Sequence, residues 1–225
     1  AEAAAVTKID VNGSDDIDGG IKSLKGIEHF TGLTTLYCDF NQLTTLDVSK
    51  NIALTWLDCN FNNLTTLDVS KNTALAGLGC NYNNLTTLDV SKNTTLTKLD
   101  CFENALTALD VSGCTALTTL YCYGNNLTAL NVSKNTALTE LYCWNNQLTA
   151  LDVSKNTALT GLYCGNNPGD GAGKFPVKVW PSFGTPPGHF TNVGWDYDGK
   201  TIVPVYSEYP AAPENEASHE DTAAK

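Results

Sequence analysis

The sequence lacks methionine, and no apolar run in its 225 residues approaches the length of a membrane span. Basic residues are also scarce: 13 Lys and Arg stand against 24 Asp and Glu, and the formal net charge is −11. Nucleic acids and anionic membranes both require a basic footprint, so we expect neither as a partner and no membrane insertion. Histidine occurs only three times. No Ser/His/Asp grouping, phosphate loop or metal motif accompanies these histidines, so we expect neither an enzyme nor a cofactor.

What is present indicates a folded chain. Hydrophobic residues make up 42% of the sequence, and 225 residues suffice for one sizeable domain. The chain opens with AEAAAV, without a basic and apolar leader. A secreted protein after removal of its signal peptide and a recombinant fragment would both begin in this way. We expect a secreted or cell-surface protein, and its oligomeric state stays open.

A repeat of 21 residues organises most of the chain. The first half of each unit, LxxLxCxxNxL, begins at Leu33, Leu54, Leu75, Leu96, Leu117, Leu138 and Leu159. The second half, LTxLDVSKNTA, begins at Leu43, Leu64, Leu85, Leu106, Leu127 and Leu148. A unit of this length is too short for two helices and a turn, and LxxLxC ends with the alternate apolar spacing of a strand. We therefore expect each unit to form one coil of a solenoid, with strands stacked in parallel at ~4.8 Å and leucines pointing inward.

Seven in-register copies of LxxLxCxxNxL resemble the signature of leucine-rich repeat proteins. The whole unit, LTxLxCxxNxLTxLDVSKNTA, is similar to the 21-residue cysteine-ladder repeats of internalin J-like bacterial surface proteins. The similarity covers residues 33–167. It implies an α/β-type or mostly β fold: a right-handed solenoid of seven coils with a parallel β-sheet on its concave face, capped at both ends. It also implies extracellular display and an adhesion or binding role, without identifying a ligand.

One cysteine per unit forms a column: Cys38, Cys59, Cys80, Cys101, Cys122, Cys143 and Cys164. Each occupies the place of an inward leucine. Stacked strands hold such side chains parallel and farther apart than the ~3.8 Å between Cβ atoms that a disulfide requires. We interpret the column as buried free thiols that pack the core. A metal, redox or catalytic role is the alternative. Cys114 lies outside the column, and we expect it to be buried in the turn but to be the most reactive thiol.

An asparagine column follows the cysteines and is interpreted as a ladder of buried amides that satisfy the backbone. Its members are Asn41, Asn62, Asn83, Asn104, Asn125, Asn146 and Asn167. A second asparagine column, in the second half of the unit, is interpreted in the same way: Asn51, Asn72, Asn93, Asn135 and Asn156. Asp47, Asp68, Asp89, Asp110 and Asp152 also align. We expect these carboxylates to bond local backbone N–H groups or a nearby lysine, with a calcium ladder as the alternative.

The outward positions around each cysteine vary from unit to unit, whereas the second half of the unit is nearly constant. Strand alternation places these variable positions on the concave surface. They carry many aromatic residues, although the core columns are already filled, so we expect an exposed face that binds a protein or glycan ligand. Its candidate residues are Tyr37, Phe40, Trp56, Asp58, Phe61, Tyr82, Asp100, Phe102, Tyr121, Tyr123, Tyr142, Trp144 and Tyr163. The alternative for these aromatics is that they fold down and cover strand backbone or the asparagine turn.

The ends depart from the repeat. We expect residues 1–32 to form an N-terminal cap, in which KIDV echoes the LDV of the repeat and Leu24, Ile27 and Phe30 make a short helical turn. Residues 33–167 would be the solenoid and 168–207 a β-rich C-terminal cap with a hairpin at Asp198-Gly199. Residues 208–225 read as an acidic disordered tail. A second function remains open for the whole chain: a structural spacer or idealised scaffold, whose regular threonine column could also suit an ice-like surface.

Overall fold

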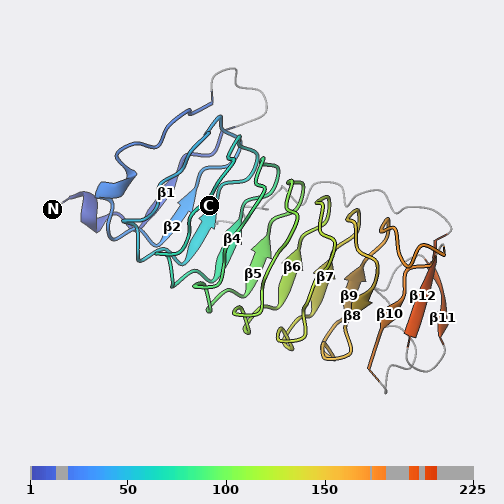
Figure 1. Cartoon of the computed structure of the whole chain (residues 1–225). Coiled ribbons are helices and arrows are strands. Elements are labelled where there is room, and N and C mark those ends of the chain that lie inside the picture. Colours follow the sequence, from blue (N-terminus) through green and yellow to red (C-terminus); the bar gives the residue numbers. More distant parts are fainter. Residues whose placement is uncertain (1, 14–19, 173, 181–192, 198–200, 207–225) are drawn as a thin grey trace, which may run out of the picture.

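An eight-stranded parallel sheet runs along the coils of the solenoid (Figure 1). The computed structural model describes residues 2–13, 20–172, 174–180, 193–197 and 201–206, the last two stretches as backbone only. The strands, in spatial order, are β1 (Lys8–Asp10), β2 (Thr35–Tyr37), β3 (Trp56–Asp58), β4 (Gly77–Gly79), β5 (Lys98–Asp100), β6 (Thr119–Tyr121), β7 (Glu140–Tyr142) and β9 (Gly161–Tyr163). Leu36 pairs with Leu57, and the same register continues from coil to coil. The predicted solenoid is confirmed.

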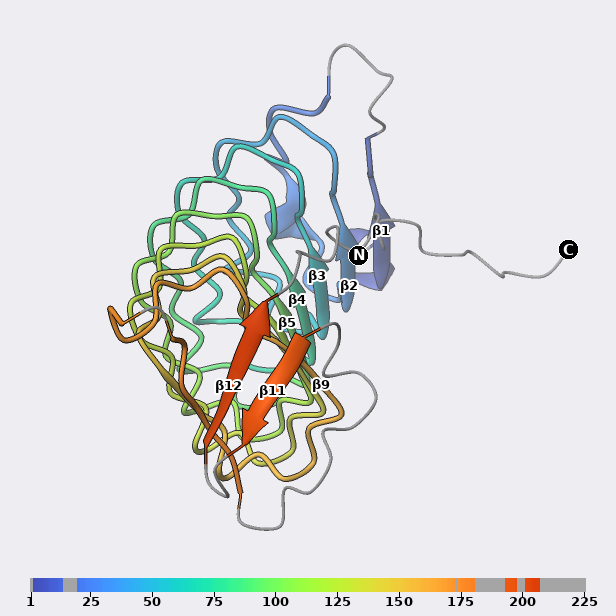
Figure 2. The same ribbon diagram turned by 90° about the vertical axis from the view of Figure 1, so that its right-hand side faces the viewer.

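The sheet follows an arc and lies on its inner, concave side (Figure 2). Inside each coil the leucine, valine and cysteine columns form one continuous core, in which Leu36, Leu57 and Val48 are fully buried. Each coil contributes the same few side chains, so the core grows by repetition rather than by a change of packing. Both outward positions of every strand are therefore left for the concave face.

The asparagine ladder joins neighbouring coils as expected. The Nδ2 group of Asn62 donates to the carbonyl oxygens of Cys38 (2.9 Å), Cys59 (3.2 Å) and Asn60 (3.0 Å), while its Oδ1 accepts the N–H of Leu43 at 2.9 Å. A buried amide is thus fully paired, and half of its bonds reach the preceding coil. Threonines add to this link, since the hydroxyl of Thr118 donates to the carbonyl of Thr97 at 3.0 Å.

All eight cysteines are free and buried. The Cys59 thiol lies 3.3 Å from the carbonyl oxygen of Gly79 on the next coil. Burial raises the pKa of the ladder thiols, for example that of Cys122 to about 12. Cys114 is also fully buried, and burial raises its pKa to about 11. The expected packing role of the column therefore agrees with the geometry.

The aspartate column bonds locally, as the sequence predicted. The Oδ1 atom of Asp47 accepts the backbone N–H of Ser49 at 2.9 Å, and the same contact recurs in later coils. These hydrogen bonds lower the pKa of the exposed Asp47 carboxyl. In the fifth coil Asn131 makes the same bond to Ser133, which explains why an amide is tolerated there.

The N-terminal segment adds one strand to the sheet. β1 pairs with β2 so that Ile9 lies opposite Leu36. The same segment contains two short 3-10 helices, η1 (Ala3–Ala5) and η2 (Ile27–His29). KIDV therefore extends the sheet by one strand, and its Ile9 occupies the place that the strand leucine has in the repeat.

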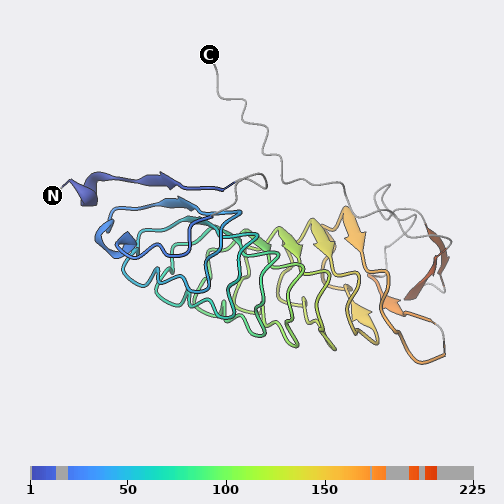
Figure 3. The same cartoon turned by 90° about the horizontal axis from the view of Figure 1, so that it is seen from above.

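At the other end a four-stranded sheet packs on the last coils (Figure 3). β10 (Val177–Lys178) pairs in parallel with β8 (Leu151–Asp152), and β12 (Thr201–Tyr206) joins β10 to β11 (Val193–Tyr197) in antiparallel fashion. The expected turn at Asp198-Gly199 and the tail 208–225 lie outside the described residues. The described part of the chain contains no helix of the length and hydropathy that crossing a bilayer requires.

Candidate ligand-binding face

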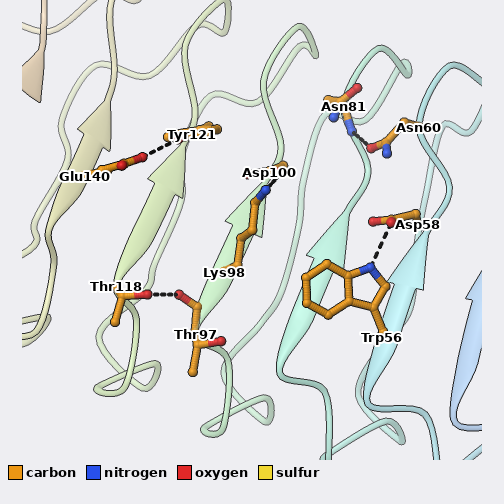
Figure 4. A network of polar contacts seen from close by, with 10 residues as sticks. All are labelled: Trp56, Asp58, Asn60, Asn81, Thr97, Lys98, Asp100, Thr118, Tyr121 and Glu140. Carbon is orange, nitrogen blue, oxygen red and sulfur yellow. Dashed lines mark hydrogen bonds and ion pairs between the residues drawn. The ribbon is translucent and has the colours of Figure 1, made fainter. Parts of the chain in front are cut away.

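The concave face carries two outward side chains per strand, one on each side of the buried leucine. Many of these side chains contact one another, within a strand or between neighbouring strands (Figure 4). The contacts fall into three groups: an indole and carboxylate over β4, an ion pair on β5, and a tyrosine–glutamate cluster on β6 and β7. A separate row of stacked rings follows the edge where the strands end.

Two side chains of β3, those of Trp56 and Asp58, lie over the glycine backbone of β4. The Trp56 Nε1–H donates to Asp58 Oδ2 at 2.8 Å, and the ring extends across β4 (Figure 4). A Cβ atom added at Gly77 would lie 2.4 Å from the Trp56 ring, and one at Gly79 would lie 2.4 Å from Asp58 Oδ1. Two glycines on one strand therefore make the space into which the indole and the carboxylate fit.

Lysines neutralise or cover neighbouring groups on the same face. Lys98 Nζ lies 3.2 Å from Asp100 Oδ2 and 5.8 Å from the centre of the Tyr121 ring on the next strand. Lys8 Nζ lies 4.9 Å from the centre of the Tyr37 ring. Both ammonium groups are close enough to a ring face for a cation–π interaction.

A tyrosine cluster occupies the C-terminal half of the face. The Tyr121 hydroxyl donates to Glu140 Oε2, and its ring stacks on that of Tyr142 with centroids 4.4 Å apart. Tyr163 meets Tyr142 edge to face at 4.3 Å. Burial, followed by the hydrogen bond to Glu140, raises the pKa of Tyr121. The phenol therefore stays protonated and keeps donating to the carboxylate.

Six further rings stack from coil to coil along the rim. Phe40, Phe61 and Tyr82 form one stack with centroids 4.3 Å apart. Phe102, Tyr123 and Trp144 form a second stack with spacings of 4.3 and 4.6 Å, and Tyr82 joins Phe102 edge to face at 5.5 Å. Parallel stacking covers the ring faces, so this row presents mainly ring edges to solvent.

The first stack is built on left-handed backbone. Phe40, Phe61 and Tyr82 have φ values of 54°, 51° and 48°, in a column that carries Gly124 and Asn145 in later coils. A left-handed conformation costs a residue with a Cβ roughly 1–2 kcal/mol. Each stacked pair contributes about 0.5–1.5 kcal/mol beyond area burial, and Phe61 makes two such pairs. Stacking thus offsets the backbone strain in the middle of the row.

Asp39 lies beside this row in a half-buried position. Its Oδ1 accepts the N–H of Asn60 at 2.7 Å, and Asn60 repeats the contact to Asn81 at 3.0 Å. Burial, followed by repulsion from Asp58, raises the pKa of Asp39 to about 7. No ion pair to Asp39 is formed by the residues that the structure describes.

The candidate residues from the sequence divide among these groups. Trp56 and Asp58 come together over β4, Asp100 lies on β5, and Tyr121, Tyr142 and Tyr163 form the tyrosine cluster, while Tyr37 stands alone under Lys8. The remaining candidates, Phe40, Phe61, Tyr82, Phe102, Tyr123 and Trp144, form the rim row.

The expectation that these aromatics stand exposed is wrong for most of them. Among the described candidates only Tyr82, at 41%, is an exposed large hydrophobic residue, and Tyr123 and Asp58 are buried. The rings cover one another because identical positions in successive coils lie one strand spacing apart. The alternative that rings fold onto strand backbone holds for Trp56.

Sequence reasoning missed several members of the network. The variable outward positions also carry Lys98, Glu140, Asn60 and the two glycines of β4. The candidate residues for ligand binding included only the aromatic and aspartate side chains at these positions. The two glycines beside Trp56 could have indicated in the sequence that a neighbouring side chain covers β4, since the same two positions carry larger side chains in most other coils. Within the described residues, no three His, Cys, Asp or Glu side chains are grouped as a metal site.

Comparison with known proteins identifies the repeat. No family model and no curated protein matches the chain. Among solved structures, the functional domain of InlJ from Listeria monocytogenes, described as including a cysteine ladder, is 42% identical with a TM-score of 0.60. That match covers 73% of this chain and 40% of the InlJ chain.

Two other internalins of Listeria monocytogenes share the fold. InlF is 24% identical with a TM-score of 0.61, over 66% of this chain and 46% of its own. InlC2 is 18% identical with a TM-score of 0.60, over 74% of both chains. The chain thus spans less than half of the InlJ and InlF chains that it matches. It is a leucine-rich repeat protein with 21-residue cysteine-ladder repeats, similar to the internalin InlJ.

Proposed function

We propose that the chain is a non-enzymatic binding or adhesion module, displayed outside the cell, that recognises a protein or glycan ligand on its concave face. One observation carries this proposal. The concave positions are the ones that vary between coils, and their side chains hold one another in place through the Trp56–Asp58, Lys98–Asp100 and Tyr121–Glu140 contacts. A preorganised surface loses little side-chain entropy on binding.

Two further points agree with this proposal. The similar proteins are internalins, and the leucine-rich repeat presents its sheet as a continuous surface.

We also propose the division into an N-terminal cap (1–32), a solenoid (33–167), a C-terminal cap (168–207) and a tail (208–225). The caps would shield the core at both ends and leave the concave face as the main surface for a ligand.

The spacer reading is the second candidate, because the second halves of the coils are nearly identical and need no ligand to explain them. A binding experiment separates the two. The immobilised chain is tested against a glycan array and a panel of purified extracellular-matrix proteins. A concave variant, Tyr37→Ser with Tyr163→Ser, is compared with a control on the exposed second halves, Thr65→Ala with Thr128→Ala.

We expect saturable binding to at least one probe, lost in the concave variant and kept in the control. Circular dichroism confirms that both variants fold. If no probe binds saturably, or if the concave variant binds as well as the control, the concave face is not a recognition surface and the spacer reading holds.

A further inference from the structure

Trp56 differs from the other rings of the concave side in what covers it. The rim rings stack on one another, and Tyr121 and Tyr142 are stacked as well. No ring contact involves Trp56 among the described residues. One face of its indole lies on the backbone of β4, where Gly77 leaves room, and the ring is seen flat against the sheet in Figure 4. The side chain is partly exposed, and no ring or ammonium group of the described residues lies over its opposite face.

The neighbouring rings show what this face accommodates. Tyr37, on the strand before, has the ammonium group of Lys8 over it, and Tyr121 has that of Lys98. Indole is the strongest cation–π acceptor of the aromatic side chains. Even so, no cation of the described chain lies over Trp56, although rings on both sides of it along the sheet are covered in this way.

The charges around Trp56 favour a cation. Its N–H is bonded to the carboxylate of Asp58, which places negative charge at the edge of the ring and makes its face more attractive to positive charge. Asp100 lies on β5, on the far side of the β4 backbone that the indole covers, and the whole chain carries a formal charge of −11. Lys98 is engaged with Asp100 and with the Tyr121 ring, on the side away from β3.

We infer that the free face of Trp56 is the seat of a guanidinium group, supplied by an arginine side chain of a protein partner. This inference deepens the proposed function, since it assumes that the concave face binds the ligand. Arginine fits better than lysine because its planar, weakly hydrated group stacks on a flat ring. A neutral saccharide could also stack on an indole, but it would gain nothing from the surrounding carboxylates.

The test measures peptide binding by the intact chain in solution. Hexa-arginine, hexa-lysine and neutral chitohexaose are each titrated while the indole N–H signals of Trp56 and Trp144 are followed by NMR. The variant Trp56→Leu keeps the net charge and removes the platform. Trp144→Phe is the matched control, because its ring remains in the rim stack. Gly77→Ala is a second variant, in which the added Cβ displaces the Trp56 ring without removing it.

We expect hexa-arginine to shift the Trp56 signal more than that of Trp144 and to bind about fivefold more weakly to Trp56→Leu. Gly77→Ala should weaken binding too, and Trp144→Phe should not. Equal affinity of hexa-arginine for the wild type and Trp56→Leu would mean attraction to acidic charge alone and would overturn the inference. So would equal binding of hexa-lysine, or a Trp56 shift produced by chitohexaose and not by hexa-arginine. Each of these results leaves the array experiment on the concave face unaffected.

Discussion

Replacing Asp39 by asparagine should stabilise the fold above neutral pH and change little near pH 4. The carboxyl is half-buried next to Asp58, and its pKa is raised to about 7. It accepts the backbone N–H of Asn60 at 2.7 Å. Asn60 performs the same task for Asn81 on the next coil, so an amide at position 39 can keep the bond.

The sign follows from where the proton binds more tightly. The folded chain holds the Asp39 proton up to about pH 7, whereas the unfolded chain releases it near the ordinary value of 3.8. Stability therefore falls as pH rises through this window and levels off above it. The difference in pKa corresponds to about 4 kcal/mol at full ionisation. Partial exposure to water reduces this effect, and we expect Asp39→Asn to gain about 1–2 kcal/mol at pH 8.

Urea unfolding at pH 4 and pH 8, followed by circular dichroism, measures both free energies of unfolding. Asp47→Asn is the control, because Asp47 is exposed, its pKa is lowered, and Asn131 shows that an amide fits the same column. Asp47→Asn should show no gain at pH 8. The reasoning is refuted if Asp39→Asn is no more stable than the wild type at pH 8, or if it gains equally at both pH values.

Substitutions at three other positions test the columns. Cys101→Ser should lower the free energy of unfolding by about 1–3 kcal/mol, because it buries a hydroxyl without an assured partner, and Cys101→Ala should cost less; thiol titration should find the ladder unreactive until denaturant is added. Cys114→Asn should raise the free energy of unfolding by about 1 kcal/mol in thermal unfolding. Asn135, at the same position of the next coil, donates two buried hydrogen bonds, whereas the Cys114 thiol makes one weak contact of 3.6 Å with the carbonyl of Val90. No gain would mean that the unpaired Oδ1 of the new amide, like that of Asn135, cancels the new bonds. Phe61→Asn should destabilise by about 1 kcal/mol in urea, because two lost stacks outweigh the relieved strain, and a more stable variant would show that strain dominates.

The repeat made the scaffold predictable from the sequence. A period of 21 fixes which positions coincide between coils, and inward Leu, Cys and Asn columns then follow from strand alternation and from the need to pair buried amides. The bonds of Asn62 and the free, buried state of Cys59 were expected on these grounds. The pairing of Ile9 with Leu36 could not be predicted in this way. These two residues are 27 positions apart, six more than the repeat, so the periodicity does not apply there.

The binding face was less predictable for a physical reason. Periodicity tells which side chains point outward, but not which way each one leans along the solenoid. The Trp56 ring lies on β4 because Gly77 has no side chain, and the Tyr121 hydroxyl reaches Glu140 on the next strand. Such contacts depend on pairs of residues about 21 positions apart that vary independently, so a list of outward aromatics overstates their exposure.

The ladder bonds that join neighbouring coils run along the axis of the solenoid, and this has a mechanical consequence. Tension applied between the two ends of the chain would peel bonds such as Thr118–Thr97 and Asn62–Cys38 one interface at a time, starting at the weaker end. Each coil that opens would release 21 residues, about 70 Å of extended chain. A force–extension trace should therefore show evenly spaced steps, and the protein would lengthen under strain in equal increments while its remaining coils stayed wound.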